Sequence, residues 1–245
     1  MSHGEAGIAV WKTEYAKAVA RTDVDVKVLL DAVKARGNWD RTVVLVVADH
    51  GESLGDQGEI LHGDAYWDSV THIPLLVRVP GIAPGARGGL VSQVDIAPTL
   101  LDLVGAVEPA DIDGASMVPL LTGDAERIRE MTLIEGGVTL AASATPRGAV
   151  IAPPWALLRQ DRGCGGQEGP RQPGEPAECL YDLAADPGQT QNVLRQNPAV
   201  RERLVTAWDE FRAARATEGQ RLDLDPAQVE ALQRTGYDFR VEADP

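Results

Sequence analysis

The chain is poor in cysteine, in aromatic side chains and in basic residues. Of its 245 residues, two are cysteine, 4% are aromatic, and 23 are Lys or Arg against 37 Asp or Glu. The net charge of −14 argues against a general nucleic-acid-binding protein, because phosphate backbones attract Lys and Arg. No apolar run approaches the ~20 residues that cross a bilayer, so we expect no membrane span.

The scarcity of cysteine also limits the possible redox chemistry. Cys164 and Cys179 do not form a CxxC pair, so we expect two unpaired thiols. A disulfide between them is the alternative if the chain is exported. Residues 1–15 lack a basic segment followed by a long apolar segment, so they predict no secretory signal, and the compartment stays open.

The first 125 residues alternate helix and strand patterns, which is typical of an α/β domain. The predicted elements are a helix over 11–36, strands over 42–48 and 74–79, and a helix over 96–105 with Asp95 as its N-cap. The run over 42–48 is apolar and β-branched without alternation. Such a run predicts a strand buried on both faces, as in a parallel sheet flanked by helices.

Residues 126–245 predict a smaller α+β subdomain. Its predicted strands cover 131–135, 149–151 and 155–158, its helices begin at Asn197 and Asp225, and the Gly- and Pro-rich segment 161–178 is a predicted mobile loop. We therefore expect two domains, over 1–125 and 126–245.

The candidate for chemistry is Asp49-His50-Gly51, directly after the strand at 42–48. Ligands of open α/β sheets lie beyond the carboxyl ends of strands. Carboxylate and imidazole are both ligands of divalent metals, so Asp49 and His50 are candidate metal ligands. The alternative is that Asp49 caps a turn and His50 packs in a polar rim.

Four ordered motifs resemble the C-terminal part of sulfatases. They are ADHGESLGDQGEILHGDAYWDSVTHIPLLVRVPG at 48–81, SQVDIAPTLL at 92–101, LYDLAADP at 180–187, and the segment from Leu224 to Tyr237. Sulfatases belong to the alkaline phosphatase superfamily, and the motifs are also similar to those of phosphonate monoester hydrolases. The resemblance implies an alkaline phosphatase-like α/β fold whose mixed or parallel sheet is flanked by helices.

The resemblance also implies roles for individual residues. Asp49 and His50 would bind the catalytic divalent metal, which is Ca²⁺ in much of the family; the imidazole of His50 makes Mn²⁺ or Zn²⁺ reasonable alternatives. His62 would face the ester and neutralise charge or protonate the leaving oxygen, unless it is a turn histidine held by local hydrogen bonds. The expected substrate is a small anionic ester.

Other polar residues are expected to be structural. We expect four acids to be solvated in a loop: Glu52, Asp56, Glu59 and Asp64. We expect Asp68 to order that loop and His72 to be structural. Tyr181 and Asp182 are expected to connect the subdomain with the core.

The family nucleophile is missing from the chain. It is a Cys or Ser in the pattern Cys/Ser-x-Pro/Ala-x-Arg, which neither Cys164 nor Cys179 begins. The acidic metal ligands of the family's first strand are also missing. The resemblance therefore implies a C-terminal portion without its N-terminal half, inactive alone and with an exposed sheet edge. The alternatives are a non-catalytic accessory domain, or a phosphonate or phosphate monoester hydrolase or phosphotransferase of the same superfamily. Many relatives are exported, which would place the protein in the periplasm or outside the cell.

Overall fold

The computed structural model describes residues 5–58, 60–62, 66–109, 112–135, 147–160, 163–164 and 177–215. In these residues the helices are α1 Glu5–Ala35, α2 Asp68–Thr71, α3 Ile96–Val104, α4 Val118–Thr122 and α5 Pro198–Arg215. The strands are β1 Val44–Val47, β2 Ser53–Leu54, β3 Ile60–Leu61, β4 Leu75–Arg78, β5 Thr132–Glu135, β6 Gly148–Ala152, β7 Trp155–Gln160 and β8 Ala177–Asp182. None of the described helices is both long and apolar enough to cross a membrane.

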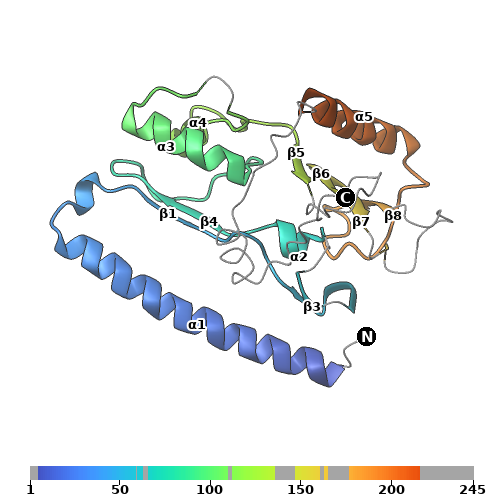
Figure 1. The fold of residues 1–245 in the computed structure, drawn as a ribbon, viewed down its shortest axis with the longest axis horizontal. Helices are drawn as coiled ribbons and strands as arrows, with labels where there is room; N and C mark the ends of the chain where they lie inside the picture. Colours follow the sequence, from blue (N-terminus) through green and yellow to red (C-terminus); the bar gives the residue numbers. More distant parts are fainter. Residues whose placement is uncertain are drawn as a thin grey trace, which may run out of the picture.

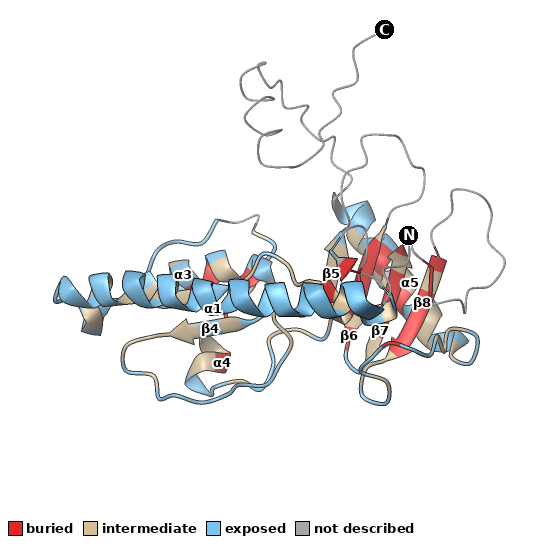
Figure 2. Ribbon diagram, turned by 90° about the horizontal axis from the view of Figure 1, so that it is seen from below, coloured by how far each residue is buried: buried red, intermediate tan, exposed pale blue. Residues whose placement is uncertain are grey.

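The predicted first helix is confirmed, and it begins earlier, at Glu5. The 31-residue α1 runs along one side of the molecule and contains no buried residue, so Figure 2 shows it as an exposed rod. It ends before Gly37, whose φ of +75° suits glycine and stops the helix.

The strands predicted at 42–48 and 74–79 are confirmed as β1 and β4, but the expected environment of β1 is wrong. The two strands pair antiparallel, with Val46 opposite Leu76, and form a two-stranded sheet. Their side chains are half-buried or exposed, and Val46 is 38% exposed. The apolar run gives the composition of a buried strand, but the described part of the chain does not cover both faces.

Helix α3 is confirmed, with Gly105 in the left-handed region at its C-terminus. Asp95 is the N-cap residue of α3, as predicted, but its side chain makes no capping bond to α3. The buried carboxylate instead accepts the backbone N–H groups of Ser92 (2.8 Å) and Ala115 (2.8 Å) and pairs with Arg129. Asp95 therefore joins the start of α3 to two later segments.

Residues 132–182 form an antiparallel sheet in the order β5-β6-β7-β8. Its two faces are both covered, as the red strands in Figure 2 show. On one face Val150, Leu157 and Leu180 pack against Leu204 and Trp208 of α5. On the opposite face, three residues from outside the strands cover the sheet: Tyr66, Trp67 and Cys164. The sheet residues that they pack against include Ala149, Leu158, Cys179 and Tyr181.

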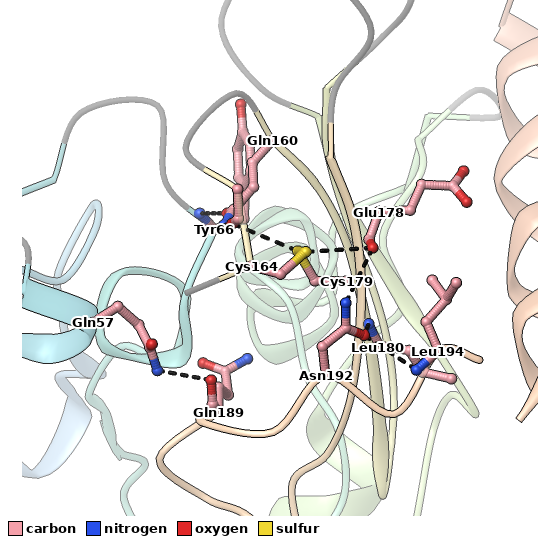
Figure 3. The surroundings of a disulfide bond; sticks show 11 residues. Gln57, Tyr66, Gln160, Cys164, Glu178, Cys179, Leu180, Gln189, Asn192 and Leu194 are labelled. Atoms are coloured by element: carbon pink, nitrogen blue, oxygen red, sulfur yellow. Dashed lines mark hydrogen bonds between the residues drawn. A yellow bond between two sulfur atoms is a disulfide. The ribbon is translucent and has the colours of Figure 1, made fainter. Parts of the chain in front are cut away.

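The prediction of two free thiols is wrong, because Cys164 and Cys179 form a disulfide (Figure 3). The left-handed turn at Gly163 and the hydrogen bond from Gln160 Nε2 to its carbonyl (2.7 Å) bring Cys164 back against β8. The two Cα atoms are 5.6 Å apart, and both residues are buried. Sequence spacing could not show this return of the chain.

Tyr181 of β8, which is predicted to connect the subdomain with the core, lies against Trp67. Its ring lies edge-on to Trp67, with 5.7 Å between the ring centres. Across the same region, Gln57 Nε2 donates to the carbonyls of Gly188 (2.8 Å) and Gln189 (2.7 Å). The helix predicted from Asp225 and most of the loop 161–178 lie outside the described residues. The division into 1–125 and 126–245 stays a prediction.

Candidate metal site

The candidate site begins where β1 ends. Gln93, from the turn before α3, donates its side-chain N–H to the carbonyls of Ala48 (3.0 Å) and Asp49 (2.8 Å). Gly51 donates its N–H to the carbonyl of Val70 (2.7 Å). A Cβ at Gly51 would lie 2.1 Å from the carbonyl oxygen of Ser69, so only glycine allows this approach. Residues 48–51 are thus fixed by Gln93 of the second motif and by the Ser69–Val70 part of their own motif.

Asp49 and His50 place two potential ligand atoms side by side. Asp49 Oδ2 lies 3.7 Å from His50 Nε2, and the carboxylate of Asp49 is 82% exposed. The separation is less than twice the ~2.1 Å of a metal–ligand bond, so one cation can contact both atoms. Asp49 Oδ1 accepts the backbone N–H of His50 at 2.9 Å. That hydrogen bond is the main reason why the pKa of Asp49 lies below its ordinary value, which keeps the carboxylate ionised.

The hydrogen bonding of His50 leaves the correct nitrogen free for a metal. Its Nδ1 lies 2.9 Å from the carbonyl oxygen of Gly51. Since a carbonyl oxygen only accepts, Nδ1 carries the proton, and Nε2 of the neutral ring keeps its lone pair. A backbone carbonyl on the second nitrogen is a common way to orient a metal-binding histidine.

His62 reaches the same place from the other arm of a hairpin. Strands β2 and β3 pair with Ser53 opposite Leu61, so the residues just beyond them, Glu52 and His62, also face each other. His62 Nδ1 is 3.4 Å from Glu52 Oε2. The rings of His62 and His50 are 4.1 Å apart, centre to centre. The structure therefore brings Asp49, His50 and His62 together.

Glu52 is the residue that the sequence interpretation missed. It is not a solvated loop acid, because its side chain is only 18% exposed. Its Oε1 is buried without a hydrogen-bond partner among the described residues, and its Oε2 faces His62. The sequence signal for the Glu52–His62 contact is the hairpin between them. The two residues are ten positions apart, and Gly55 and Gly58, which allow a tight turn, lie between them in left-handed conformations.

The remaining polar candidates lie away from this cluster or play structural parts. His72 is exposed and lies 3.3 Å from Asp68 Oδ2, which agrees with a structural histidine. The backbone N–H of Asp68 donates to Gln189 Oε1 at 2.6 Å, so Asp68 belongs to the contact with the subdomain. Asp56 is exposed and accepts the N–H of Leu54. Glu59 and Asp64 lie outside the described residues.

A complete metal site is not assembled within the described ranges. No group of three or more His, Cys, Asp or Glu side chains in them could hold a metal ion. Asp49 and His50 thus offer two potential ligand atoms, whereas a structural zinc site, for example, has four ligands.

The described helices and strands form an α/β fold with the Asp49–His50–His62 cluster beyond β1, and comparison with known proteins identifies the family. The model of the sulfatase family matches residues 12–106, which include Asp49, His50 and His62. Residues 12–106 therefore belong to the sulfatase family.

Individual relatives agree with this assignment. Choline-sulfatase of Rhizobium meliloti is 32% identical over 206 residues, which are 82% of this chain and 36% of that protein. Among solved structures, the phosphonate monoester hydrolase of Agrobacterium radiobacter superposes with a TM-score of 0.64 and 25% identity, over 80% of this chain and 40% of the other.

A third match supports the fold. A protein solved in complex with its substrate, D-glucosamine-2-N,6-O-disulfate, superposes with a TM-score of 0.69 and 21% identity, over 86% of this chain and 43% of the other. The α/β, alkaline phosphatase-like fold expected from the motifs is therefore confirmed. The chain spans less than half the length of each of these proteins.

Proposed function

We propose that this chain is the metal-binding part of a sulfate ester hydrolase, with Asp49 and His50 as two ligands of a divalent cation. The observation that supports the proposal most directly is the pair of unblocked ligand atoms, Asp49 Oδ2 and His50 Nε2, beyond β1 in the segment that matches the sulfatase family. The cation would act as a Lewis acid on the ester oxygens. An imidazole in the pair suits Mn²⁺ or Zn²⁺, while Ca²⁺ prefers oxygen ligands.

His62 is the proposed proton carrier of the site. Its Nδ1 faces the carboxylate of Glu52, so exchange of a proton with the leaving oxygen of the ester falls to Nε2. The Glu52 carboxylate would orient the ring and stabilise its protonated form. His62 and Glu52 thus act on the leaving group, and Asp49 and His50 hold the cation.

We further propose that the chain alone does not turn over sulfate esters. Covalent catalysis in this family's manner needs a nucleophile beside the metal, and no Cys/Ser-x-Pro/Ala-x-Arg pattern occurs in the sequence. The purified chain should give no measurable hydrolysis of nitrophenyl sulfate or nitrophenyl phosphate with Ca²⁺, Mn²⁺ or Zn²⁺. Robust turnover that Asp49→Ala abolishes would overturn this part of the proposal.

Metal binding is tested separately from turnover. Calorimetric titration with Mn²⁺, Zn²⁺ and Ca²⁺ should show one weak site, with affinity at least tenfold lower in Asp49→Asn and in His50→Gln. The matched controls are Asp56→Asn and His72→Gln, which change the same residue types at exposed positions outside the pair. Equal losses in the controls, or no binding to the unaltered chain, would contradict Asp49 and His50 as ligands.

A phosphonate or phosphate monoester is the second candidate substrate. The observation in its favour is the similarity to the Agrobacterium radiobacter phosphonate monoester hydrolase over 80% of this chain. Choline-sulfatase matches a similar share at higher sequence identity, which favours sulfate esters. Comparing the inhibition of metal binding by inorganic sulfate and by phenylphosphonate would rank the two classes.

A further inference from the structure

We infer that two buried glutamines, Gln160 of β7 and Gln189 after β8, position His62 from the side of the four-stranded sheet. Both bind the backbone of the segment that follows His62 and not its ring, so they are positioning residues. The inference deepens the proposed function, since it rests on His62 as the proton carrier of the site. Its test measures where the His62 ring lies, and needs neither a metal nor turnover.

Gln160 is a fully buried polar residue whose side-chain amide is paired at both ends. Its Oε1 accepts the backbone N–H of Tyr66 at 3.1 Å (Figure 3), and its Nε2 donates to the carbonyl of Gly163 at 2.7 Å. A buried amide is stable only when both of its groups are paired, so these two bonds hold the side chain in one place. Tyr66 follows His62 by four residues, and Gln160 thus fixes the chain just beyond His62.

The disulfide holds the residue to which Gln160 donates. Gly163 directly precedes Cys164, and Cys164 is bonded to Cys179 of β8. Both cysteines are buried, so the bridge keeps the carbonyl of Gly163 beside the end of β7. The hydrogen bonds from Tyr66 through Gln160 to Gly163 therefore end at a covalent link within the four-stranded sheet.

Gln189 holds the same segment at a second point. The residue is 4% exposed, and its Oε1 accepts the backbone N–H of Asp68, two residues after Tyr66, at 2.6 Å. Asp68 is the first residue of α2, and the first N–H groups of a helix have no partner within it. Gln189 supplies that partner, so the start of α2 is set by a residue that lies more than a hundred positions further along the chain.

The chain is also held on the other side of His62. Five residues before His62, Gln57 donates its side-chain N–H to the carbonyls of Gly188 (2.8 Å) and Gln189 (2.7 Å). Gln189 thus binds the hairpin ahead of His62 through its backbone and the segment after His62 through its side chain. His62 lies between two attachments to the same side of the molecule.

The contacts of the His62 ring itself do not hold it firmly. Its side chain is 49% exposed, and within the described ranges its one hydrogen-bond partner is Glu52 Oε2, at 3.4 Å. That distance is long for a hydrogen bond, and the neighbouring ring of His50 adds contact without a directional bond. The backbone attachments at Gln57 and Tyr66 therefore decide how close the ring of His62 lies to that of His50.

The test measures the proximity of two histidine rings by NMR, without added metal and at one fixed pH. The ring protons of His62 and His50 should show a nuclear Overhauser effect (NOE), because the ring centres are 4.1 Å apart. Gln160→Met and Gln189→Met keep the approximate size of the side chain and remove its hydrogen bonds, so each should weaken this NOE at least twofold. Gln196→Met makes the same change at an exposed position before α5 and should leave the NOE unchanged.

Two results would overturn the inference. The first is a lower melting temperature of Gln160→Met and Gln189→Met with an unchanged NOE, because the glutamines would then only stabilise the fold. The second is an equal loss of the NOE in Gln196→Met. Circular dichroism verifies that each variant is folded, and the two glutamines lie on different segments, so one variant can report if the other unfolds.

Reduction of the disulfide is an additional measurement that needs no substitution. It should loosen Gly163 and weaken the NOE between the His62 and His50 rings, and an unchanged NOE would overturn the part assigned to the disulfide. The proposed function can fail separately, because the calorimetric titrations test metal binding and the NOE is measured without a metal.

Discussion

The four-stranded sheet of β5, β6, β7 and β8 and the two-stranded sheet of β1 and β4 contain similar apolar residues, yet these residues differ sharply in burial. Val150, Leu157 and Leu180 are almost completely buried, while Val46 and Leu76 are exposed. The four-stranded sheet has α5 on one face and the Tyr66–Trp67 segment with the disulfide on the other. The comparison teaches that apolar composition marks where a core can form, and that covering layers decide whether it does.

The largest expected effect contrasts two tryptophans. Trp208→Ala removes a side chain that is 1% exposed and packs on β6–β8, and should cost about 3–5 kcal/mol of the free energy of unfolding. Trp11→Ala, in the exposed α1, should cost less than about 1 kcal/mol. Urea unfolding followed by circular dichroism gives both values. Equal losses would show that the two regions share one core and would remove the contrast.

The next effect concerns the disulfide. Replacing both Cys164 and Cys179 by Ala should destabilise the chain by about 2–4 kcal/mol, because the bridge closes a loop in the unfolded state. Reduction of the disulfide in the unaltered chain should lower the free energy of unfolding by a similar amount. The amide hydrogen-exchange rates of β1 and α1 should stay unchanged. Mass spectrometry of the air-oxidised native protein should find no free thiol, and two alkylated cysteines would contradict the structure.

An intermediate effect is expected from the ion pairs of Glu178. Its Oε1 accepts Arg159 Nε at 3.0 Å, and its Oε2 accepts Arg201 Nε at 2.7 Å. Glu178→Gln should cost about 1–3 kcal/mol, because among the described residues it leaves the largely buried Arg159 with the more distant Asp209 as its acidic partner.

The matched change in α1 is Asp31→Asn, which breaks the exposed pair with Lys27 and should leave the urea midpoint unchanged. A loss in Asp31→Asn as large as that in Glu178→Gln would show that α1 is as tightly held as the four-stranded sheet.

The smallest expected effect is a pH dependence from Asp186. Burial raises the pKa of its carboxyl group, but hydrogen bonds from Gln191 and Thr190 outweigh burial and lower the pKa overall. The ionised form therefore stabilises the fold above the unfolded pKa of about 3.9, and this contribution is lost as pH falls through the folded pKa.

The difference in stability between the unaltered chain and Asp186→Asn should accordingly be largest near neutral pH and shrink below about pH 4. Asp25→Asn on α1 is the control, and urea unfolding at a series of pH values is the measurement. A difference that grows on acidification would contradict the assignment.

Much of the secondary structure could be predicted from local patterns. The apolar runs gave β1 and β4, Gly105 marked the end of α3, and Asn197-Pro198 marked the start of α5. The errors came from contacts between distant segments. Asp95 occupies the N-cap position as predicted, yet its side chain binds Ala115 and Arg129 and does not cap the helix. The disulfide was only the alternative to two unpaired thiols, because Cys164 approaches β8 only through the turn at Gly163.

The candidate site also combines features that local sequence predicts with features that only distant contacts set. The residue types and order of Asp49, His50 and His62 were sufficient to propose metal and ester chemistry. Their relative positions were not available from the sequence, because the β2–β3 hairpin sets the contact of His62 with Glu52 and with His50. Which nitrogen of His50 is free depends on one backbone carbonyl, at Gly51.

The sequence by itself determined the family, the α/β class and the ligand types of the candidate metal pair, because these depend on local patterns and ordered motifs. Only the tertiary structure decided that the apolar β1 is half-exposed, that the two cysteines are joined and that Glu52 lies beside His62. The physical reason is that burial, disulfides and hydrogen bonds depend on which distant segments meet, and local propensity carries no information about an absent or distant neighbour.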